Sequence, residues 1–284
     1  MRELTDADVA AVPLPGLVDE VARCLADLGT GAASQAPKAF LPIGPGAFFL
    51  SIAGVVPRLG LAAAKWASYV PGGAGSPGVS TSTVVVSDAR TGEPLALVGG
   101  MAFTQRRTAA TAVAVARAAS TGDPRTVALV GCGDTNRAVL DAVLASAPGV
   151  QVRVLVRSSA SAASLRDGLA PVVGADRLVV STDPGVVAGA DWAFSATGAT
   201  APVTALADLA PGATAVALDG ARTWRLPAGT PVLDDHVRPD GGVPEVPRLL
   251  AGTVARPAGR VLLDVAGSAV SDVALAACLL GDPR

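Results

Sequence analysis

The apolar positions in the first third of the chain change from helical to strand-like spacing. Residues 17–28 carry leucine and valine at every third or fourth position, which predicts an amphipathic helix that ends near Gly29 and Gly31. Thr5 is placed to cap a short helical turn before it. From residue 39 to residue 64, short apolar runs alternate with glycine and proline, a pattern typical of strands joined by tight turns.

Two further strands and a helix follow a segment rich in glycine and proline, residues 71–80, which we expect to be flexible. β-Branched residues predict a strand over 83–87, and a turn over 88–92 leads into a second strand over 95–98. Thr104 is the expected N-cap of an alanine-rich helix that continues to about residue 119.

The pattern changes again at about residue 120, where short apolar strands begin to alternate with helical segments. The expected strands are 127–130, 152–156, 178–180, 191–195, 213–218 and 261–264, with helices over 134–145, 160–169 and 268–280. This alternation predicts a parallel sheet with helices on both faces. The expected fold class is therefore α/β: a Rossmann-type domain over residues 120–264, and a discontinuous α+β domain for substrate and dimerisation over residues 1–119, joined by the C-terminal segment 265–284.

Composition narrows the class of protein. Half of the residues are hydrophobic, 16% are charged and the net charge is -2, which excludes extensive disorder and makes nucleic acid an unlikely partner. No segment has the 18–20 uninterrupted apolar residues of a membrane span, and the first residues carry acids where a signal peptide is basic, so we expect a soluble cytoplasmic protein with no membrane partner. Three widely spaced cysteines and a single histidine argue against a disulfide framework and against a metal site.

A glycine pair lies directly between a predicted strand and a predicted helix. Gly131 allows a tight turn and Gly133 lets the backbone approach a pyrophosphate, beside the helix N-terminus that begins with Asp134 and Thr135. Asn136 stands where the fingerprint has a third glycine or alanine, and the charge of Asp134 would face the phosphates. The context favours a dinucleotide site over an ordinary strand-turn-helix connection, which remains the alternative.

The end of the next strand bears on which dinucleotide is bound. An NAD site usually has an acid there for the ribose hydroxyls, whereas this chain has Arg157, Ser158 and Ser159. Arginine and two hydroxyls suit a 2′-phosphate, so NADP(H) is the preferred cofactor and NAD(H) the possible one. The alternative is a solvated helix start.

Lysine is rare in this chain. Of the 22 basic residues, only Lys38 and Lys65 are lysine. A lysine can give up its proton and arginine cannot, so either residue is a candidate for proton transfer, or both are chance leftovers of a bias toward arginine.

Five segments together resemble the ornithine cyclodeaminase/μ-crystallin family. They are Lys-Trp-Ala-Ser-Tyr at 65–69, Thr-Gly-Glu-Pro at 91–94, Arg-Thr-Ala-Ala at 107–110, Ser-Ala-Thr at 195–197, and the G-x-x-x-x-D segment at 267–272. Their order and spacing, together with the glycine pair, extend the resemblance over roughly the whole chain. The Lys-Trp pair and the segment 232–237 are most similar to the branch that oxidises amino-acid adducts to make 2,3-diaminopropionate.

The resemblance implies a bilobal homodimer with the active site in the cleft between the lobes. It implies hydride transfer between a nicotinamide and the α-carbon of a small amino, imino or keto acid. Lys65 would shuttle the proton, Asp272 would lie near nicotinamide and substrate, and Arg107 would bind the α-carboxylate, joined by Lys38 where the family often has arginine. Ser195, Ala196 and Thr197 would belong to the cofactor site.

Two other activities stay open within the family. One is binding of a ligand or cofactor without catalysis, as in crystallin-like members. The other is an NAD-dependent cyclodeaminase, an ammonia lyase, which is disfavoured because Asp219 aligns only approximately with the acid that this reaction requires. His236, the sole histidine, is expected to make a polar contact only.

Overall fold

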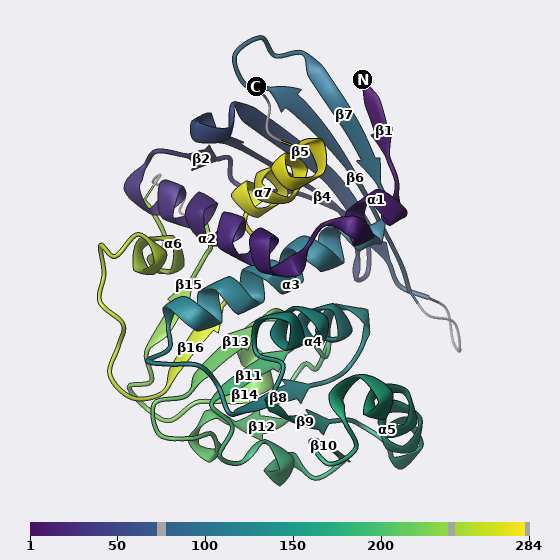
Figure 1. Ribbon diagram of the computed structural model, residues 1–284, viewed down its shortest axis with the longest axis vertical. Helices are drawn as coiled ribbons and strands as arrows, with labels where there is room; N and C mark the ends of the chain where they lie inside the picture. Colours follow the sequence, from purple (N-terminus) through teal and green to yellow (C-terminus); the bar gives the residue numbers. More distant parts are fainter. Residues whose placement is uncertain (73–77, 238–241, 282–284) are drawn as a thin grey trace. The chain divides into compact units, whose positions relative to one another are not determined.

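The computed structural model describes residues 1–72, 78–237 and 242–281, and these divide into two compact units (Figure 1). The first unit contains residues 1–108, 236–253 and 267–284, and the second contains residues 109–235 and 254–266. The segment 236–253, which the sequence analysis placed with the Rossmann domain, lies in the first unit. Residues 73–77, in the segment expected to be flexible, lie outside the described part of the chain.

A mostly antiparallel sheet forms the centre of the first unit. Its strands run in the order β1-β7-β6-β5-β4-β2, with β3 also paired to β4. The elements are β1 (Arg2–Leu4), α1 (Asp6–Ala11), α2 (Leu14–Thr30), β2 (Ser34–Gln35), β3 (Ala39–Gly44), β4 (Ala47–Val56), η1 (Pro57–Leu59), β5 (Leu61–Val70), β6 (Val79–Asp88), β7 (Pro94–Gly99), α3 (Met101–Ala118, which continues into the second unit), α6 (Glu245–Leu250) and α7 (Ala269–Leu280).

Alternating burial along β6 and β7 distinguishes an inner from an outer face of this sheet. In β6 and β7, Val84, Val86, Ala96 and Val98 are fully buried on the inner face, while the residues between them are exposed or half-buried. Helix α7 packs against β4 and β5, and α2 packs against α7 and α6 (Figure 1). The buried stripe of α2 explains its helical spacing in the sequence.

Local signals explain several element boundaries. Thr5 caps α1 in a reciprocal capping box with Asp8, and Gly31 ends α2 in a left-handed conformation with φ of 80°, as predicted. Gly29 lies inside α2, where an added Cβ would collide with the backbone of Pro247 in α6, so glycine is needed there for helix packing. The expected cap at Thr104 is wrong, because α3 already begins at Met101 and the Thr104 hydroxyl instead hydrogen-bonds with Ser82, 3.1 Å away.

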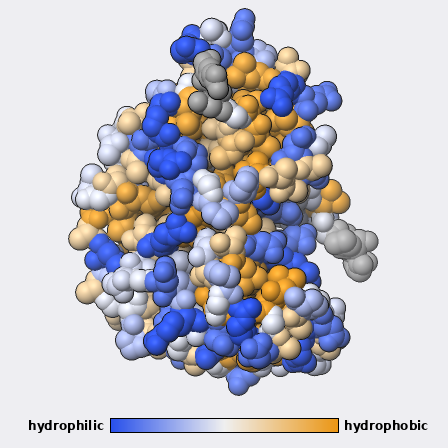
Figure 2. Space-filling model, viewed as in Figure 1, coloured by the Kyte–Doolittle hydropathy of each residue, from blue (hydrophilic) through white to orange (hydrophobic). Residues whose placement is uncertain are grey.

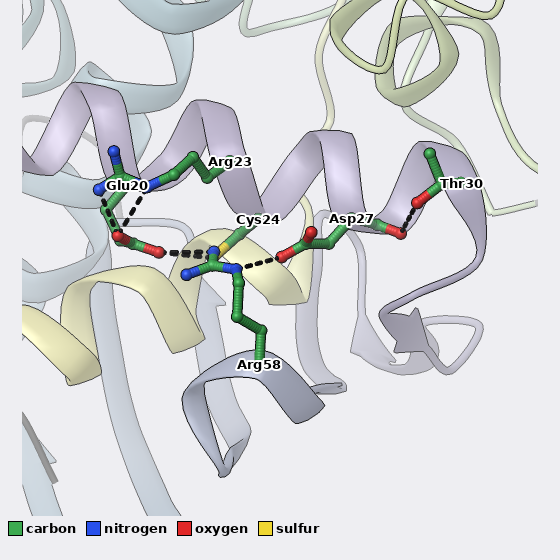
Figure 3. Close-up of polar contacts among 6 residues, drawn as sticks. All are labelled: Glu20, Arg23, Cys24, Asp27, Thr30 and Arg58. Atoms are coloured by element: carbon green, nitrogen blue, oxygen red, sulfur yellow. Dashed lines mark hydrogen bonds and ion pairs between the residues drawn. The ribbon is translucent and has the colours of Figure 1, made fainter. Parts of the chain in front are cut away.

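An ion-pair network fastens α2 to the turn after β4 (Figure 3). Arg58 in η1 donates to Asp27 at 2.9 Å and to Glu20 at 2.7 Å, and Glu20 also accepts from Arg23. Burial acts to raise the pKa of Glu20, but the two arginines outweigh it and hold that pKa below its ordinary value. Since Glu20 and Asp27 are seven residues apart in α2, one guanidinium reaches both of them from the same side of the helix.

The second unit is built on a fully parallel seven-stranded sheet in the order β10-β9-β8-β11-β13-β16-β15. Its elements are β8 (Thr126–Val130), α4 (Asp134–Ser146), β9 (Gln151–Leu155), α5 (Ser159–Val173), β10 (Leu178–Ser181), η2 (Pro184–Val187), β11 (Trp192–Ser195), β12 (Thr204–Ala205), η3 (Leu206–Asp208), β13 (Thr214–Ala217), η4 (Ala221–Thr223), β14 (Trp224–Arg225), β15 (Val232–Asp234) and β16 (Val261–Asp264). The mixed α/β class with a Rossmann-like parallel sheet is confirmed.

The cover of this sheet differs from the expectation of helices on both faces. Ala128, Val130 and Ala193 on one face pack in a cluster with Leu206 and Trp224, which come from η3 and the short β12–β14 ribbon. Among the described residues, this cluster contains none from the long helices α4 and α5. The strands carry mostly alanine and valine there, and short turns can approach such small side chains closely.

In the space-filling view, polar side chains are spread over the visible surface and apolar ones form patches between them (Figure 2). None of the helices in the described residues is both long and apolar enough to cross a membrane.

Candidate functional site

Three charged side chains that lie far apart in the sequence meet inside the first unit. Lys65 Nζ donates to Asp272 Oδ1 at 3.1 Å, and Arg107 Nε lies 3.1 Å from the same oxygen. All three are buried, with exposed fractions of 3% for Lys65, 7% for Arg107 and 1% for Asp272. A buried cluster of two cations on one carboxylate costs desolvation energy, which points to a chemical role.

Each of these three side chains comes from a different secondary-structure element of the first unit. Lys65 lies on the inner face of β5, opposite Ile52 of β4 and Val84 of β6, where α7 packs on the sheet. Arg107 comes from α3, and Asp272 from the first turn of α7.

Gly267, just before α7, allows the guanidinium of Arg107 to lie against the backbone. It has φ of 94°, and an added Cβ would lie 2.6 Å from Arg107 Nη1. This close approach explains the glycine of the G-x-x-x-x-D segment.

Burial and, to a smaller extent, the positive charge of Arg107 lower the pKa of Lys65 to about 8, against the opposing effect of Asp272. An amine with this pKa exchanges its proton readily near neutral pH, as a general acid or base must. Asp272 Oδ2 is buried and makes no hydrogen bond within the described residues, so this oxygen can accept a proton donor from a ligand.

Lys38 lies just before β3 and is half-buried. Ala39 pairs with Ser51 of β4, and the next residue of β4, Ile52, pairs with Lys65, so Lys38 is two strands away at about the same level of the sheet. Its positive charge also lowers the pKa of Lys65. The structure thus places both lysines on one side of the first unit, and Lys65 is bonded to Asp272.

The second unit has a cavity at the carboxyl ends of β8 and β11, where the strand order reverses. This is the point at which open α/β sheets bind ligands. The cavity has a volume of about 590 Å³ and is lined by Val130, Gly131, Cys132, Gly133, Leu155, Val156, Arg157, Ser161, Leu165, Thr182, Pro184, Ala196, Thr197, Gly198, Ala199 and Val203. Its size is suitable for a nucleotide-sized ligand.

The glycine turn is required by close packing at this point. Gly131 has φ of 81°, and an added Cβ would lie 2.8 Å from the carbonyl oxygen of Ala196. Gly133 is the N-cap residue of α4 and lines the cavity, so the free N–H groups of the helix start lie beside it. These features fit a pyrophosphate.

The structure separates the predicted cofactor residues into two groups. Gly131, Gly133, Arg157, Ala196 and Thr197 line the cavity. Five others do not line it: Asp134, Thr135, Ser158, Ser159 and Ser195.

The hydroxyls of Ser158 and Ser195 already have structural partners. Ser158 caps α5 by accepting from the Ser161 N–H at 3.2 Å. Ser195 is fully buried, where it donates to Asp219 at 2.9 Å and accepts from Trp224 at 3.1 Å.

Sequence reasoning missed several residues that line the cavity, including Cys132, Ser161 and Thr182. Thr182 directly follows β10, the third strand of the parallel sheet. Ligands of such sheets bind at the carboxyl ends of the strands, so its position after a predicted strand was a signal for Thr182. Ser161 stands one turn into α5, behind the serine that caps it.

Asp219 links the loops that follow β11 and β13 through hydrogen bonds. Its carboxylate accepts from Ser195, from both the N–H and the hydroxyl of Thr197, and from Thr223, at 2.7–3.0 Å. Both oxygens are therefore engaged in holding the Ser-Ala-Thr segment, whose Thr197 lines the cavity.

His236 is exposed. Within the described ranges, no three His, Cys, Asp or Glu side chains come together as the ligands of a metal ion would.

Known structures with this fold cover nearly the whole chain. The Δ1-pyrroline-2-carboxylate reductase of Thermococcus litoralis, solved with NADH and L-proline, superposes with a TM-score of 0.83 at 19% identity, over 98% of this chain and 96% of that one. An archaeal alanine dehydrogenase dimer with bound NAD has a TM-score of 0.80 at 18% identity, over 98% and 94%. The iminosuccinate reductase of Paracoccus denitrificans, solved with NAD+, has a TM-score of 0.80 at 19% identity, over 99% and 95%.

These identities are low, so the superpositions establish the fold. No curated protein matches the chain in sequence. The sequence pattern of one family matches residues 16–225, which is most of the chain, and includes Lys65, Arg107 and the glycine turn. The chain belongs to the ornithine cyclodeaminase/mu-crystallin family.

Proposed function

We propose that this chain is an NAD(P)-dependent oxidoreductase that transfers a hydride at the α-carbon of an amino or imino acid, by C=N/CH–NH chemistry. The observation that carries the proposal is the buried Lys65–Asp272–Arg107 cluster, together with a nucleotide-sized cavity at the switch point of the parallel sheet. The T. litoralis and P. denitrificans proteins, whose names describe reductases, share this fold and were solved with nicotinamide dinucleotides. Specialised amino-acid biosynthesis is the proposed setting.

Each residue of the cluster has a distinct part in the reaction. When bound, the nicotinamide supplies the hydride in reduction and accepts it in oxidation. Arg107, assisted by Lys38, binds the substrate carboxylate through charge-assisted hydrogen bonds. Lys65 Nζ gives a proton to the nitrogen as the C=N bond is reduced, and takes one from the substrate ammonium before oxidation. Asp272 orients Lys65 and offers Oδ2 to the substrate N–H.

The cofactor cavity is proposed to hold the dinucleotide by backbone and side-chain contacts. Gly131, Gly133 and the start of α4 face the pyrophosphate, with Asp134 and Thr135 at the same helix start. Ala196 and Thr197 line the cavity next to Gly131, and Asp219 holds this segment through Ser195 and Thr197.

We propose NADP(H) as the preferred cofactor because Arg157 lines the cavity at the end of β9, beside Ser158 and Ser159. Replacing Arg157 with alanine should weaken NADPH binding by roughly 10-fold or more, the value of one charge-assisted hydrogen bond, and leave NADH binding nearly unchanged. Dissociation constants for both cofactors, measured by nicotinamide fluorescence, test this. An equal loss for both would show that Arg157 does not contact the 2′-phosphate.

We propose a homodimer that buries the outer face of the first-unit sheet. This face carries Trp66, 46% exposed, stacked on Phe49 at a centroid distance of 5.1 Å, and Val85, 37% exposed. Beside them, Ala62 and Ala64 line a shallow apolar cavity of about 350 Å³. Exposed apolar surface of this kind is typical of an interface between copies of a chain.

Changing Trp66 to glutamate should therefore convert the dimer to a monomer, because it buries a charge in the interface. Sedimentation at micromolar concentration checks this, with Val179→Glu, an exposed position on β10 of the other unit, as the control. A monomeric mass for the unaltered protein would refute the dimer.

A cytoplasmic location is proposed as well, and the three free cysteine thiols support it. Cell fractionation tests it, and recovery in a secreted fraction would contradict it.

The function itself is tested by titrating the protein with NADPH and NADH, then screening amino acids, and keto acids with amines, for cofactor oxidation or reduction. Binding together with substrate-dependent hydride transfer supports the proposal. Binding without transfer to any substrate would instead indicate a non-catalytic binder, and product formation without net cofactor change would indicate a lyase.

A further inference from the structure

The side chain of Asn136 makes an unusual set of contacts beneath the cofactor cavity. It lies in the first turn of α4 and is fully buried. Its Nδ2 lies 2.7 Å from the carbonyl oxygen of Gly131, 3.1 Å from that of Val130 and 3.3 Å from that of Phe194. Its Oδ1 is buried and has no hydrogen-bond partner among the described residues.

These three carbonyls belong to the two strands between which the cavity opens. Val130 ends β8 and Gly131 follows it, while Phe194 is the penultimate residue of β11. One amide group therefore ties both strand ends to the start of α4. In the Rossmann fingerprint this position is a small residue that allows close helix–strand packing. Here hydrogen bonds take the place of that close packing.

We infer that Asn136 is a positioning residue for dinucleotide binding, an inference that rests on the proposed function. Its amide holds the Gly131 carbonyl toward the protein interior. In a trans peptide the C=O and the next N–H point in opposite directions, so the Cys132 N–H is turned toward the cavity that residues 131–133 line. That N–H then serves as a donor to a phosphate oxygen.

The donor character of the amide is what this role requires. A carboxylate at the same place would set a negative charge against three carbonyl oxygens, whereas a protonated carboxylic acid could still donate to one of them. Because a buried acid among carbonyls has a raised pKa, the loss of cofactor affinity in Asn136→Asp, relative to the unaltered protein at the same pH, should grow as the pH rises.

The test is calorimetric titration of NADP+ and NAD+ from pH 5.5 to 8.5 against the unaltered protein, Asn136→Asp and Asn136→Ala. Asn136→Asp should bind at least about 10-fold more weakly at pH 8.5 and recover toward normal as the pH falls. Asn136→Ala should bind weakly at every pH. Gln151→Glu, the same amide-to-acid change at an exposed position on β9, is the matched control and should bind normally.

Amide hydrogen exchange of the unaltered protein adds a test that needs no variant. Saturation with NADP+ should slow exchange of the Cys132 amide, and an unchanged rate would overturn the inference. Normal cofactor affinity of both Asn136 variants at all pH values would also overturn it and leave the proposed function standing. Failure of the unaltered protein to bind either dinucleotide would refute the proposed function itself.

Discussion

Replacing Lys65 with arginine will lower kcat by about 100-fold or more, the usual size of a general acid–base contribution. Arginine keeps the positive charge beside Asp272 but does not release its proton at any working pH. The cofactor's dissociation constant should change little, because Lys65 is not among the residues that line the cofactor cavity. Steady-state kinetics with a substrate identified by screening provide the measurement.

Lys38→Arg is the matched control, since a carboxylate contact needs only charge and donors. It should retain most of the activity. Lys65→Met, which has similar length without the amine, covers the case in which the larger arginine disturbs the buried site. Near-normal turnover of a folded Lys65→Arg protein would show that Lys65 is an electrostatic anchor.

The pKa of Lys65 also determines how the reaction rate of the unaltered protein depends on pH. Because the pKa of Lys65 is lowered to about 8, oxidation of an amino acid, which needs the neutral amine, should accelerate as the pH rises through 8. Reduction needs the ammonium form and should slow over the same range. In Lys65→Arg, this change of rate around pH 8, the Lys65 limb of the pH profile, should disappear.

Stability should respond to pH through Lys65 as well. Between about 8 and its ordinary value of 10.5, the lysine is neutral in the folded chain and protonated in the unfolded chain. The unfolded state then binds more protons, so the Lys65 contribution to the free energy of unfolding increases with pH across this window.

Replacing Asp272 with asparagine should have the second-largest effect, because it leaves Lys65 and Arg107 as buried cations without their shared carboxylate. Removing one partner of a buried ion pair costs roughly 3–5 kcal/mol, so the free energy of unfolding at pH 7 should fall by about that amount. The charge of Asp272 raises the pKa of Lys65, so the activity limb of the variant should move to a pH below 8.

Urea denaturation and the pH profile of kcat/KM measure these two effects. Asp176→Asn, at an exposed position, is the control and should change neither. A stable variant with an unshifted limb would mean that Asp272 does not set the proton affinity of Lys65.

Local patterns predicted the fold well where one physical effect dominates. The stripe of α2, the β-branched alternation of β6 and the short apolar strands of the parallel sheet each reflect burial on one face. The start of α3 was predicted four residues late, because Thr104 has the chemistry of an N-cap but its hydroxyl instead hydrogen-bonds with Ser82 of a neighbouring strand. A tertiary contact of this kind leaves no trace in local sequence.

In the candidate site, too, the sequence predicted which residues matter, whereas contacts that depend on the tertiary structure could not be predicted. The sequence singled out Lys65, Arg107 and Asp272, and the structure brings all three together although they lie up to 207 positions apart. Asn136 appeared in the sequence only as a departure from a glycine fingerprint. Its three carbonyl partners depend on the paths of β8 and β11, which the sequence pattern does not specify in atomic detail.

Transfer of deuterium from NADPH that is labelled at C4 of the nicotinamide tests the proposed hydride transfer most directly. Both C4-labelled stereoisomers are supplied, because hydride leaves from only one face of the ring. The protein is incubated with each and with keto acids plus amines, and the products are analysed by mass spectrometry. With one of the two stereoisomers, we expect an amino-acid product that carries one deuterium at the α-carbon, and in Lys65→Arg a transfer rate reduced about 100-fold or more. Cofactor binding without deuterium in any product, from either stereoisomer of NADPH or NADH, would contradict the proposed hydride transfer.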